Sequence, residues 1–240
     1  VKDKFFRGKK VFSIFVEHGA PSDIMYLQKP HIGTDLLQNV VKNIRNSIIR
    51  MGGEFRYSAC VTDLFIENGK VVGIEINGKE QISCSVLVLA VGHSARDTFD
   101  MLYRRGVEMK AKPFAVGVRV QHPQSMIQMS QYGTLDSRFP VADYKLTYTT
   151  KKGRSVYSFC MCPGGFVVNA SSEEGRLAIN GMSYHARDSK NANSALVVTV
   201  GPKDFGDNPM DGIEFQRKLE EKAYIAGKGF IPVQLYKDFC

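Results

Sequence analysis

The stretch VLVLAVGHS occupies residues 86–94 and joins a continuous apolar run, Val86–Val91, to a turn that contains a glycine. A continuous apolar run of this length is typical of a strand that is buried on both faces of a parallel sheet. We therefore expect a buried strand over residues 86–91 that ends at Gly92 and His93. The run is too short to cross a bilayer as a helix, so we expect no membrane partner.

Three shorter strands are predicted before this run, over residues 55–66, 70–76 and 79–85. The dipeptides that separate them are Asn68-Gly69 and Asn77-Gly78. Asn-Gly indicates a hairpin, because both central positions of a type I′ turn need a positive φ. The pattern therefore predicts a three-stranded antiparallel meander in front of the apolar strand.

Helices are predicted on both sides of these strands. Thr34 is a favourable N-cap for an amphipathic helix that Gly52-Gly53 ends. Residues 94–97, Ser-Ala-Arg-Asp, resemble a capping box that opens a second helix, which ends at Gly106. One face of the first helix must pack on a hydrophobic core, because its apolar residues recur at helical spacing.

The composition changes near residues 110–113, and most elements predicted beyond this point are strands. These strands cover residues 114–120, 143–149, 156–162, 165–170, 177–184 and 195–200. A helix with a capping-box pattern follows from Asp211 to Gly227. We therefore predict an α+β fold in two parts, residues 1–110 and residues 111–240, of which the second is mixed and β-rich.

The chain has 240 residues, of which 43% are hydrophobic and 23% charged, and it carries a net charge of +8. This ordinary balance excludes collagen-like and wholly disordered classes. Half of the net charge lies in residues 1–10. A basic arm of this kind can contact phosphates, but a solvated terminus is the more ordinary explanation, so we do not expect nucleic acid as a partner. We found no helix-turn-helix, zinc-finger or RNA-binding signature that favours nucleic acid.

The five cysteines are an odd number without the spacing of a disulfide framework. This usage suits reduced thiols and a cytoplasmic location, and the N-terminus shows no secretion signal. Cys160 and Cys162 form a C-x-C pair, but no second pair supplies the other ligands of a metal site. We therefore predict no metal.

A polar segment, His185-Ala186-Arg187-Asp188, lies between two apolar strands, and Asn193 follows it. A loop at this place could direct these side chains at an anionic or hydrogen-bonding ligand. Single histidines are more often structural, so both interpretations stay open. The same two interpretations apply to Arg119, His122 and the pair Tyr144-Lys145.

Six segments together resemble one family. They are 29–35 (KPHIGTD), 92–99 (GHSARDTF), 112–119 (KPFAVGVR), 157–165 (YSFCMCPGG), 180–184 (NGMSY) and 191–195 (NANSA). This set is similar to a bacterial family of uncharacterised FAD-dependent dehydrogenases, described as NAD- or FAD-utilising, in the two-dinucleotide-binding-fold flavoprotein superfamily.

The resemblance implies that residues 1–110 are part of an FAD-binding domain and that residues 111–240 are the inserted substrate-side domain. Members of the family also carry an N-terminal Gly-rich FAD motif and a C-terminal segment that closes over the flavin. Neither is found in this sequence, so we expect an internal fragment of a flavoprotein. The parent protein would bind FAD, with NAD(P)H as a reductant. The fragment alone is expected to be inactive and to bind no cofactor, because it lacks the amides that hold the pyrophosphate.

The resemblance also implies roles for individual residues. The implied cofactor-side residues are His31, Gly33, Thr34, Val61, Ala90, Gly92 and His93. The implied substrate-side residues are Arg119, His122, Tyr144, Lys145 and Asn193. The candidate catalytic residues are His185 and Arg187.

Two classes of function remain open on this sequence. The first is a fragment of a cytoplasmic FAD-dependent oxidoreductase, a dehydrogenase whose partners are a small-molecule substrate and the missing N- and C-terminal parts of its own chain. The second is a non-catalytic binding module whose basic N-terminal arm contacts nucleic acid.

Overall fold

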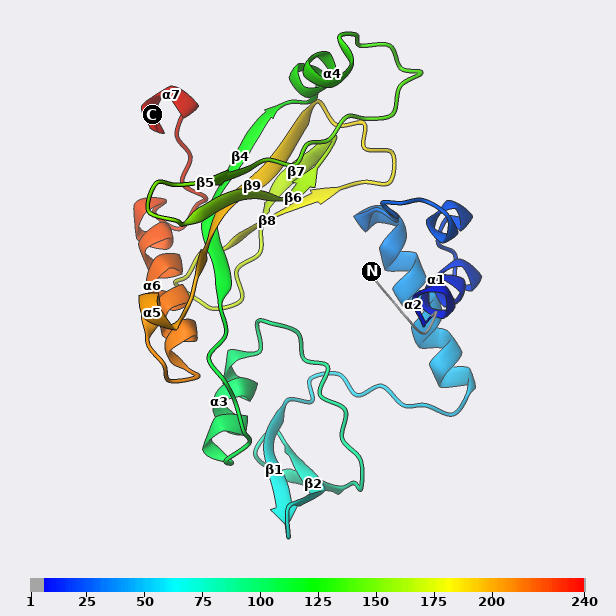
Figure 1. The fold of residues 1–240 in the computed structure, drawn as a ribbon. Helices are drawn as coiled ribbons and strands as arrows, with labels where there is room; N and C mark the ends of the chain where they lie inside the picture. The colour runs from blue at the N-terminus through cyan, green and yellow to red at the C-terminus, as the bar shows by residue number, and fades with distance from the viewer. Residues whose placement is uncertain (1–6, 240) are drawn as a thin grey trace. The chain divides into compact units, whose positions relative to one another are not determined.

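The computed structural model describes residues 7–239 and has the predicted α+β fold (Figure 1). The helices are α1 (Arg7–Glu17), a short 3-10 helix η1 (Ser22–Met25), α2 (Thr34–Arg50), α3 (Arg96–Arg104), α4 (Gln124–Tyr132), α5 (Pro202–Phe205), α6 (Asp211–Ala226) and α7 (Tyr236–Phe239). The strands are β1 (Val61–Glu67), β2 (Lys70–Ile76), β3 (Glu80–Ser83), β4 (Phe114–Pro123), β5 (Thr147–Thr149), β6 (Ser155–Cys162), β7 (Gly165–Asn169), β8 (Ile179–Ser183) and β9 (Asn191–Val200).

The chain packs into two compact units, each built from segments that are separate in sequence. Unit 1 comprises the described residues of Val1–Glu54 together with Ala115–Ala170 and Ala178–Thr199. Unit 2 comprises Phe55–Phe114, Ser171–Leu177 and the described residues of Val200–Cys240. The division of the chain at residue 110 into a cofactor-binding part and a substrate-side part stays a prediction. By packing, the N-terminal helices belong with the strands that follow residue 114.

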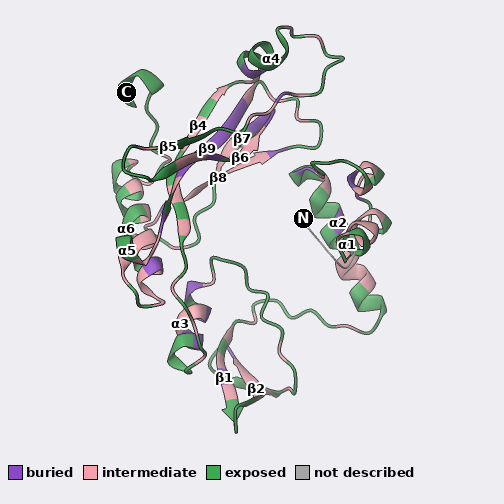
Figure 2. Cartoon of the chain, viewed as in Figure 1, coloured by how far each residue is buried: buried purple, intermediate pink, exposed green. Residues whose placement is uncertain are grey.

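Unit 1 contains a four-stranded sheet in the order β4-β9-β6-β5 and a two-stranded hairpin, β7-β8. The pairs β5-β6 and β6-β9 are antiparallel, and a bulge interrupts the second pair between Phe159 and Cys162. The central strand β9 carries a buried run from Ala192 to Ser194 (Figure 2). This burial fits a strand that has a neighbour on each side.

The helices α1, η1 and α2 share a small hydrophobic core in unit 1. Ala20, Ile24 and Val40 are buried there, and Phe12 and Phe15 pack against them. The predicted amphipathic helix is therefore confirmed, but its predicted N-cap is wrong. Gly33 occupies the N-cap with φ 91°, and Thr34 is the first helical residue. The Thr34 hydroxyl instead donates to the Ser183 carbonyl oxygen at 3.5 Å.

Unit 2 contains the predicted antiparallel meander, in the order β1-β2-β3. Both Asn-Gly turns have the predicted positive φ, with 50° and 75° at Asn68-Gly69 and 54° and 67° at Asn77-Gly78. Leu64, Met101 and Leu102 are buried where α3 meets this meander. The hairpin prediction is confirmed because the dihedral preferences of Asn and Gly act locally.

The predicted buried strand over residues 86–91 is wrong for this chain. The segment has no strand assignment, and Val86 and Val88 are 77% and 81% exposed. A parallel strand needs hydrogen-bonding neighbours and layers that cover both faces. The described residues place no strand beside this segment, so most of its apolar side chains stay in contact with solvent, whereas Leu87 packs against the core of unit 2.

The predicted capping box at Ser94 is also wrong. The helix α3 begins at Arg96, and its N-cap Ala95 has no side-chain cap. The Ser94 hydroxyl instead lies 2.9 Å from Nδ1 of His93. The Ser94 hydroxyl therefore contacts the His93 ring and does not accept a hydrogen bond from a backbone N–H of the first turn of α3, as a capping serine would.

Candidate functional site

Two loops of unit 1 meet through three hydrogen bonds, although they are about 150 residues apart in sequence. His31 Nε2 lies 3.0 Å from the Tyr184 carbonyl oxygen, and His185 Nδ1 lies 3.0 Å from the Ile32 carbonyl oxygen. The Asp35 carboxylate accepts a hydrogen bond of 2.9 Å from the backbone N–H of His185. The contacts join the implied cofactor-side loop to the segment that holds both candidate catalytic residues.

Gly33 allows this close approach. It is buried with φ 91°, and a Cβ at this position would overlap the backbone nitrogen of His185. Any other residue would therefore move the two loops apart. His31, Gly33 and Thr34 all lie at this junction, so the structure brings together two sets of residues that the sequence analysis had placed on different sides of the site.

The junction is electrostatically biased toward neutral imidazole. The rings of His31 and His185 are stacked, with centroids 6.4 Å apart and planes 3° apart. Burial lowers the pKa of His31, and the positive charge of Arg187 lowers it further. For Asp35, burial opposes ionisation, but backbone hydrogen bonds led by that of His185 give a net decrease in its pKa. At neutral pH, Asp35 is therefore ionised and His31 is neutral.

Arg187 holds a strained backbone conformation beside this junction. Its φ is 51°, in the left-handed region that a non-glycine residue rarely adopts. Its backbone lies so close to Gly164 that a Cβ at Gly164 would overlap the Arg187 carbonyl. Its side-chain Nε is buried and has no acceptor within residues 7–239. Arg187 is therefore a donor that the described chain leaves unsatisfied.

The implied substrate-side residues lie on the sheet of unit 1 in two separate pairs. Arg119 on β4 donates through Nη1 to Oδ1 of Asn193 on β9 and to the Cys160 carbonyl oxygen, the latter at 3.3 Å. His122 Nε2 lies 2.9 Å from the Tyr144 hydroxyl oxygen. Burial raises the pKa of Tyr144, and a hydrogen bond with Ser194 opposes the increase.

These two pairs contact neighbouring residues of β9. Asn193 and Ser194 are consecutive on β9, so their side chains point to opposite sides. Arg119 contacts the first, and Tyr144 contacts the second. Lys145 is exposed. The structure therefore divides the implied substrate-side set into an Arg119–Asn193 pair and a His122–Tyr144 pair.

The remaining implied cofactor-side residues lie in unit 2. Val61 is the first residue of β1 and pairs with Ile76. Ala90, Gly92 and His93 are exposed, and Gly92 has φ 74°. The implied cofactor set is thus divided between the two units.

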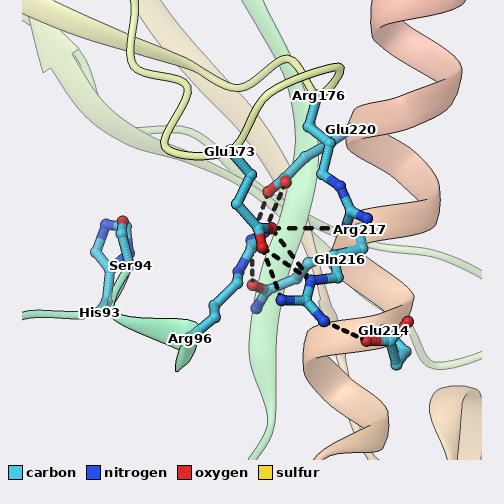
Figure 3. Close-up of polar contacts among 9 residues, drawn as sticks. All are labelled: His93, Ser94, Arg96, Glu173, Arg176, Glu214, Gln216, Arg217 and Glu220. Atoms are coloured by element: carbon cyan, nitrogen blue, oxygen red, sulfur yellow. Dashed lines mark hydrogen bonds and ion pairs between the residues drawn. The ribbon is translucent and has the colours of Figure 1, made fainter. Parts of the chain in front are cut away.

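The sequence analysis missed a buried ionic cluster in unit 2 (Figure 3). Arg96 is 7% exposed, and its guanidinium contacts Glu173 at 2.5 Å and Glu220 at 2.7 Å. Arg217 contacts the other side of the Glu173 carboxylate at 2.7 Å. The hydrogen bond from Arg217, followed by that from Arg96, lowers the pKa of Glu173 to about 2. The cluster joins α3, the segment 171–177 and α6, and it fixes the helix that follows the exposed turn at His93.

A family model and a relative were found for this chain. A profile described as "FAD-dependent protein, C-terminal domain-like" matches residues 113–240, which is more than half of the chain. The chain belongs to this FAD-dependent protein family. It is also 54% identical over 235 residues to an uncharacterized protein of Clostridium beijerinckii, an alignment that covers 95% of this chain and 44% of that protein. The chain therefore spans less than half the length of that relative.

Within residues 7–239, no helix is both long and apolar enough to cross a membrane. The same residues contain no group of three or more His, Cys, Asp and Glu side chains that could hold a metal ion.

Proposed function

We propose that this chain is part of an FAD-dependent oxidoreductase, a dehydrogenase, and that unit 1 carries residues that face its flavin and its substrate. The support is the family match over residues 113–240 together with the junction of the His31 and His185 loops. At this junction, His31 and Ile32, which lie outside the matched region, form hydrogen bonds with Tyr184 and His185, which lie within it.

The donors at this junction fit the cofactor of the family. Arg187 has a buried Nε–H without an acceptor in the described chain, and α2 begins with Thr34 at the same junction. N–H donors and a helix N-terminus are groups that bind carbonyl and phosphate oxygens. We propose that His31, Gly33, Thr34 and Arg187 hold the cofactor here. A cofactor-binding role for Val61, Ala90, Gly92 and His93, which belong to unit 2, is a separate proposal that the family resemblance supports. Bound FAD would supply the electron-transfer chemistry, and the protein would bind and orient the substrate.

The histidines at the junction are arranged to accept a proton. The Ile32 carbonyl oxygen can only accept a hydrogen bond, so Nδ1 of His185 carries a hydrogen and, in the neutral form of the ring, Nε2 is the nitrogen with the lone pair. The Tyr184 carbonyl oxygen fixes the opposite tautomer for His31, with the lone pair on Nδ1. We propose His185 as the general base for the substrate and His31 as the residue that positions it.

The test is the cofactor content and activity of the full-length polypeptide that carries these residues. We expect the purified protein to be yellow, to release FAD that mass spectrometry identifies, and to bleach when NADH or NADPH is added without oxygen. His185→Gln should retain FAD and lose most turnover, whereas Arg138→Met, at a surface ion pair with Asp136, should behave as wild type. A colourless protein that contains no flavin would contradict the proposal.

The second candidate, a nucleic-acid-binding module, depends on the basic N-terminal arm. Lys9 and Lys10 are exposed on α1, whereas Lys2 and Lys4 lie outside the described residues. Retention of the chain on duplex or single-stranded DNA that weakens steeply with salt would favour this function. A cytoplasmic location, a small-molecule substrate and binding to further segments of its own longer chain remain proposals alongside the oxidoreductase.

A further inference from the structure

Arg119 is a half-buried cation without an acidic partner in the described part of the chain. Its oxygen acceptors are the Asn193 amide and the Cys160 carbonyl, and both are neutral. Both of these bonds come from Nη1, and the guanidinium also interacts with the Cys162 thiol. A guanidinium with free donors and reduced hydration interacts favourably with an anion.

The amide of Asn193 is the second unsatisfied group at this place. Asn193 is fully buried, and its Nδ2 has no acceptor within the described residues. Because Oδ1 and Nδ2 belong to one amide, this unused donor lies beside the Arg119 guanidinium that contacts Oδ1. A buried N–H without an acceptor is costly, so an acceptor supplied by a ligand would be favourable.

Gly181 on β8 lets the Arg119–Asn193 pair lie directly against the backbone of this strand. A Cβ at Gly181 would overlap the Arg119 guanidinium and the Oδ1 atom of Asn193. The nearby Cys162 thiol does not neutralise Arg119, because burial raises the pKa of Cys162 and keeps it protonated at neutral pH. The pair thus keeps one full positive charge and one neutral donor.

The geometry points to a carboxylate-binding site formed by Arg119 and Asn193, whose side chains pack against Gly181. The planar fork of arginine matches the two oxygens of a carboxylate, and the amide N–H adds a third donor. A single positive charge suits a monoanion better than a phosphate group, which carries nearly two negative charges at pH 7. That the bound carboxylate belongs to the substrate depends on the proposed function, whereas its binding to this chain does not.

The experiment measures binding of benzoate to the 240-residue chain by calorimetry, with benzamide as the neutral molecule of the same shape. We expect benzoate to bind and benzamide not to bind. Arg119→Met should weaken benzoate binding at least about tenfold, and Arg119→Lys, which keeps the charge and loses the fork, should weaken it less. Arg138→Met removes a charge from a surface ion pair of unit 1 and should leave the affinity unchanged.

Circular dichroism establishes whether each variant is folded. If Arg119→Met does not fold, the binding of benzoate by Arg119→Lys is compared with that by wild type. Three outcomes would overturn the assignment: no benzoate binding, equal benzoate binding by wild type and the Arg119 variants, or tighter binding of inorganic phosphate than of benzoate. No flavin is present in this measurement. A flavin-free full-length protein would therefore contradict the proposed function without affecting this result.

Discussion

Arg96 in unit 2 and Arg119 in unit 1 are both withdrawn from solvent, but they have opposite surroundings. Arg96 contacts two carboxylates, Glu173 and Glu220, and a Gln216 side-chain oxygen. Within residues 7–239, Arg119 contacts neutral groups, namely the Asn193 amide, the Cys160 carbonyl and the Cys162 thiol. A fully neutralised arginine fixes the fold, whereas an arginine without a counter-charge is available to a ligand.

The largest effect is expected for Arg96→Met. The variant leaves Glu173 and Glu220 without their shared cation, so we expect the free energy of unfolding to fall by about 3 kcal/mol. Arg104→Met on the same helix is the matched control, because Arg104 is exposed and forms a surface ion pair with Asp100. It should cost less than about 1 kcal/mol. Urea unfolding of both variants measures the difference in stability. Equal unfolding midpoints would contradict the structural role of Arg96.

A pH dependence is expected from the same cluster. The pKa of Glu173 is about 2 in the folded chain, below its ordinary value of 4.5. The stabilisation is therefore complete above about pH 4.5 and is lost as the pH falls toward 2. Unfolding midpoints measured across this range should fall more steeply for wild type than for Glu173→Gln. Parallel curves for the two proteins would contradict the assigned cause.

Gly181→Ala tests the space around Arg119. The added methyl group overlaps Arg119 and Asn193, so we expect a loss of about 1–2 kcal/mol of stability from overpacking. Gly201→Ala is the control, since its nearest atoms are 3.8 Å away and its φ is −141°. Thermal unfolding of the two variants gives the comparison. A Gly181→Ala protein as stable as wild type would show that the site is less crowded than described.

Arg119→Met is expected to cost about 1 kcal/mol, because Oδ1 of buried Asn193 loses its donor but no carboxylate is left uncompensated. The contrast with Arg96→Met is the direct test of the comparison, and both are measured by urea unfolding. If the two variants lose the same stability, Arg119 is structural and the difference in counter-charge has no functional meaning.

The smallest effect is expected for Arg187→Ala, within about 0.5 kcal/mol. Alanine, like arginine, has a Cβ that makes φ 51° unfavourable, so the substitution does not change the backbone strain. Arg187→Gly should be slightly more stable, because glycine adopts this conformation readily. Differential scanning calorimetry compares the three proteins. A large loss in Arg187→Ala would instead reveal a structural role for the side chain.

Many individual residues of the candidate site could be proposed from the sequence, but which of them contact one another in the folded chain could not. The polar segment at His185 was recognisable because His, Arg and Asn are concentrated between apolar strands. Its contact with the His31 loop joins residues 153 positions apart, and no local pattern encodes it. Likewise, the Arg96 cluster combines residues separated by 77 and 124 positions. Only the "ARDTF" segment drew attention to Arg96, and nothing there indicated burial.

The sequence by itself determined the features that depend on neighbouring residues. Asn68-Gly69 and Asn77-Gly78 make their turns because the backbone preferences of Asn and Gly are intrinsic, and α2 forms from helical spacing of apolar residues. Tertiary structure alone decided the fate of residues 86–91, because a strand is buried only where other strands and layers cover it. It also decided which arginine is neutralised, because a counter-charge comes from whichever segment folds beside it.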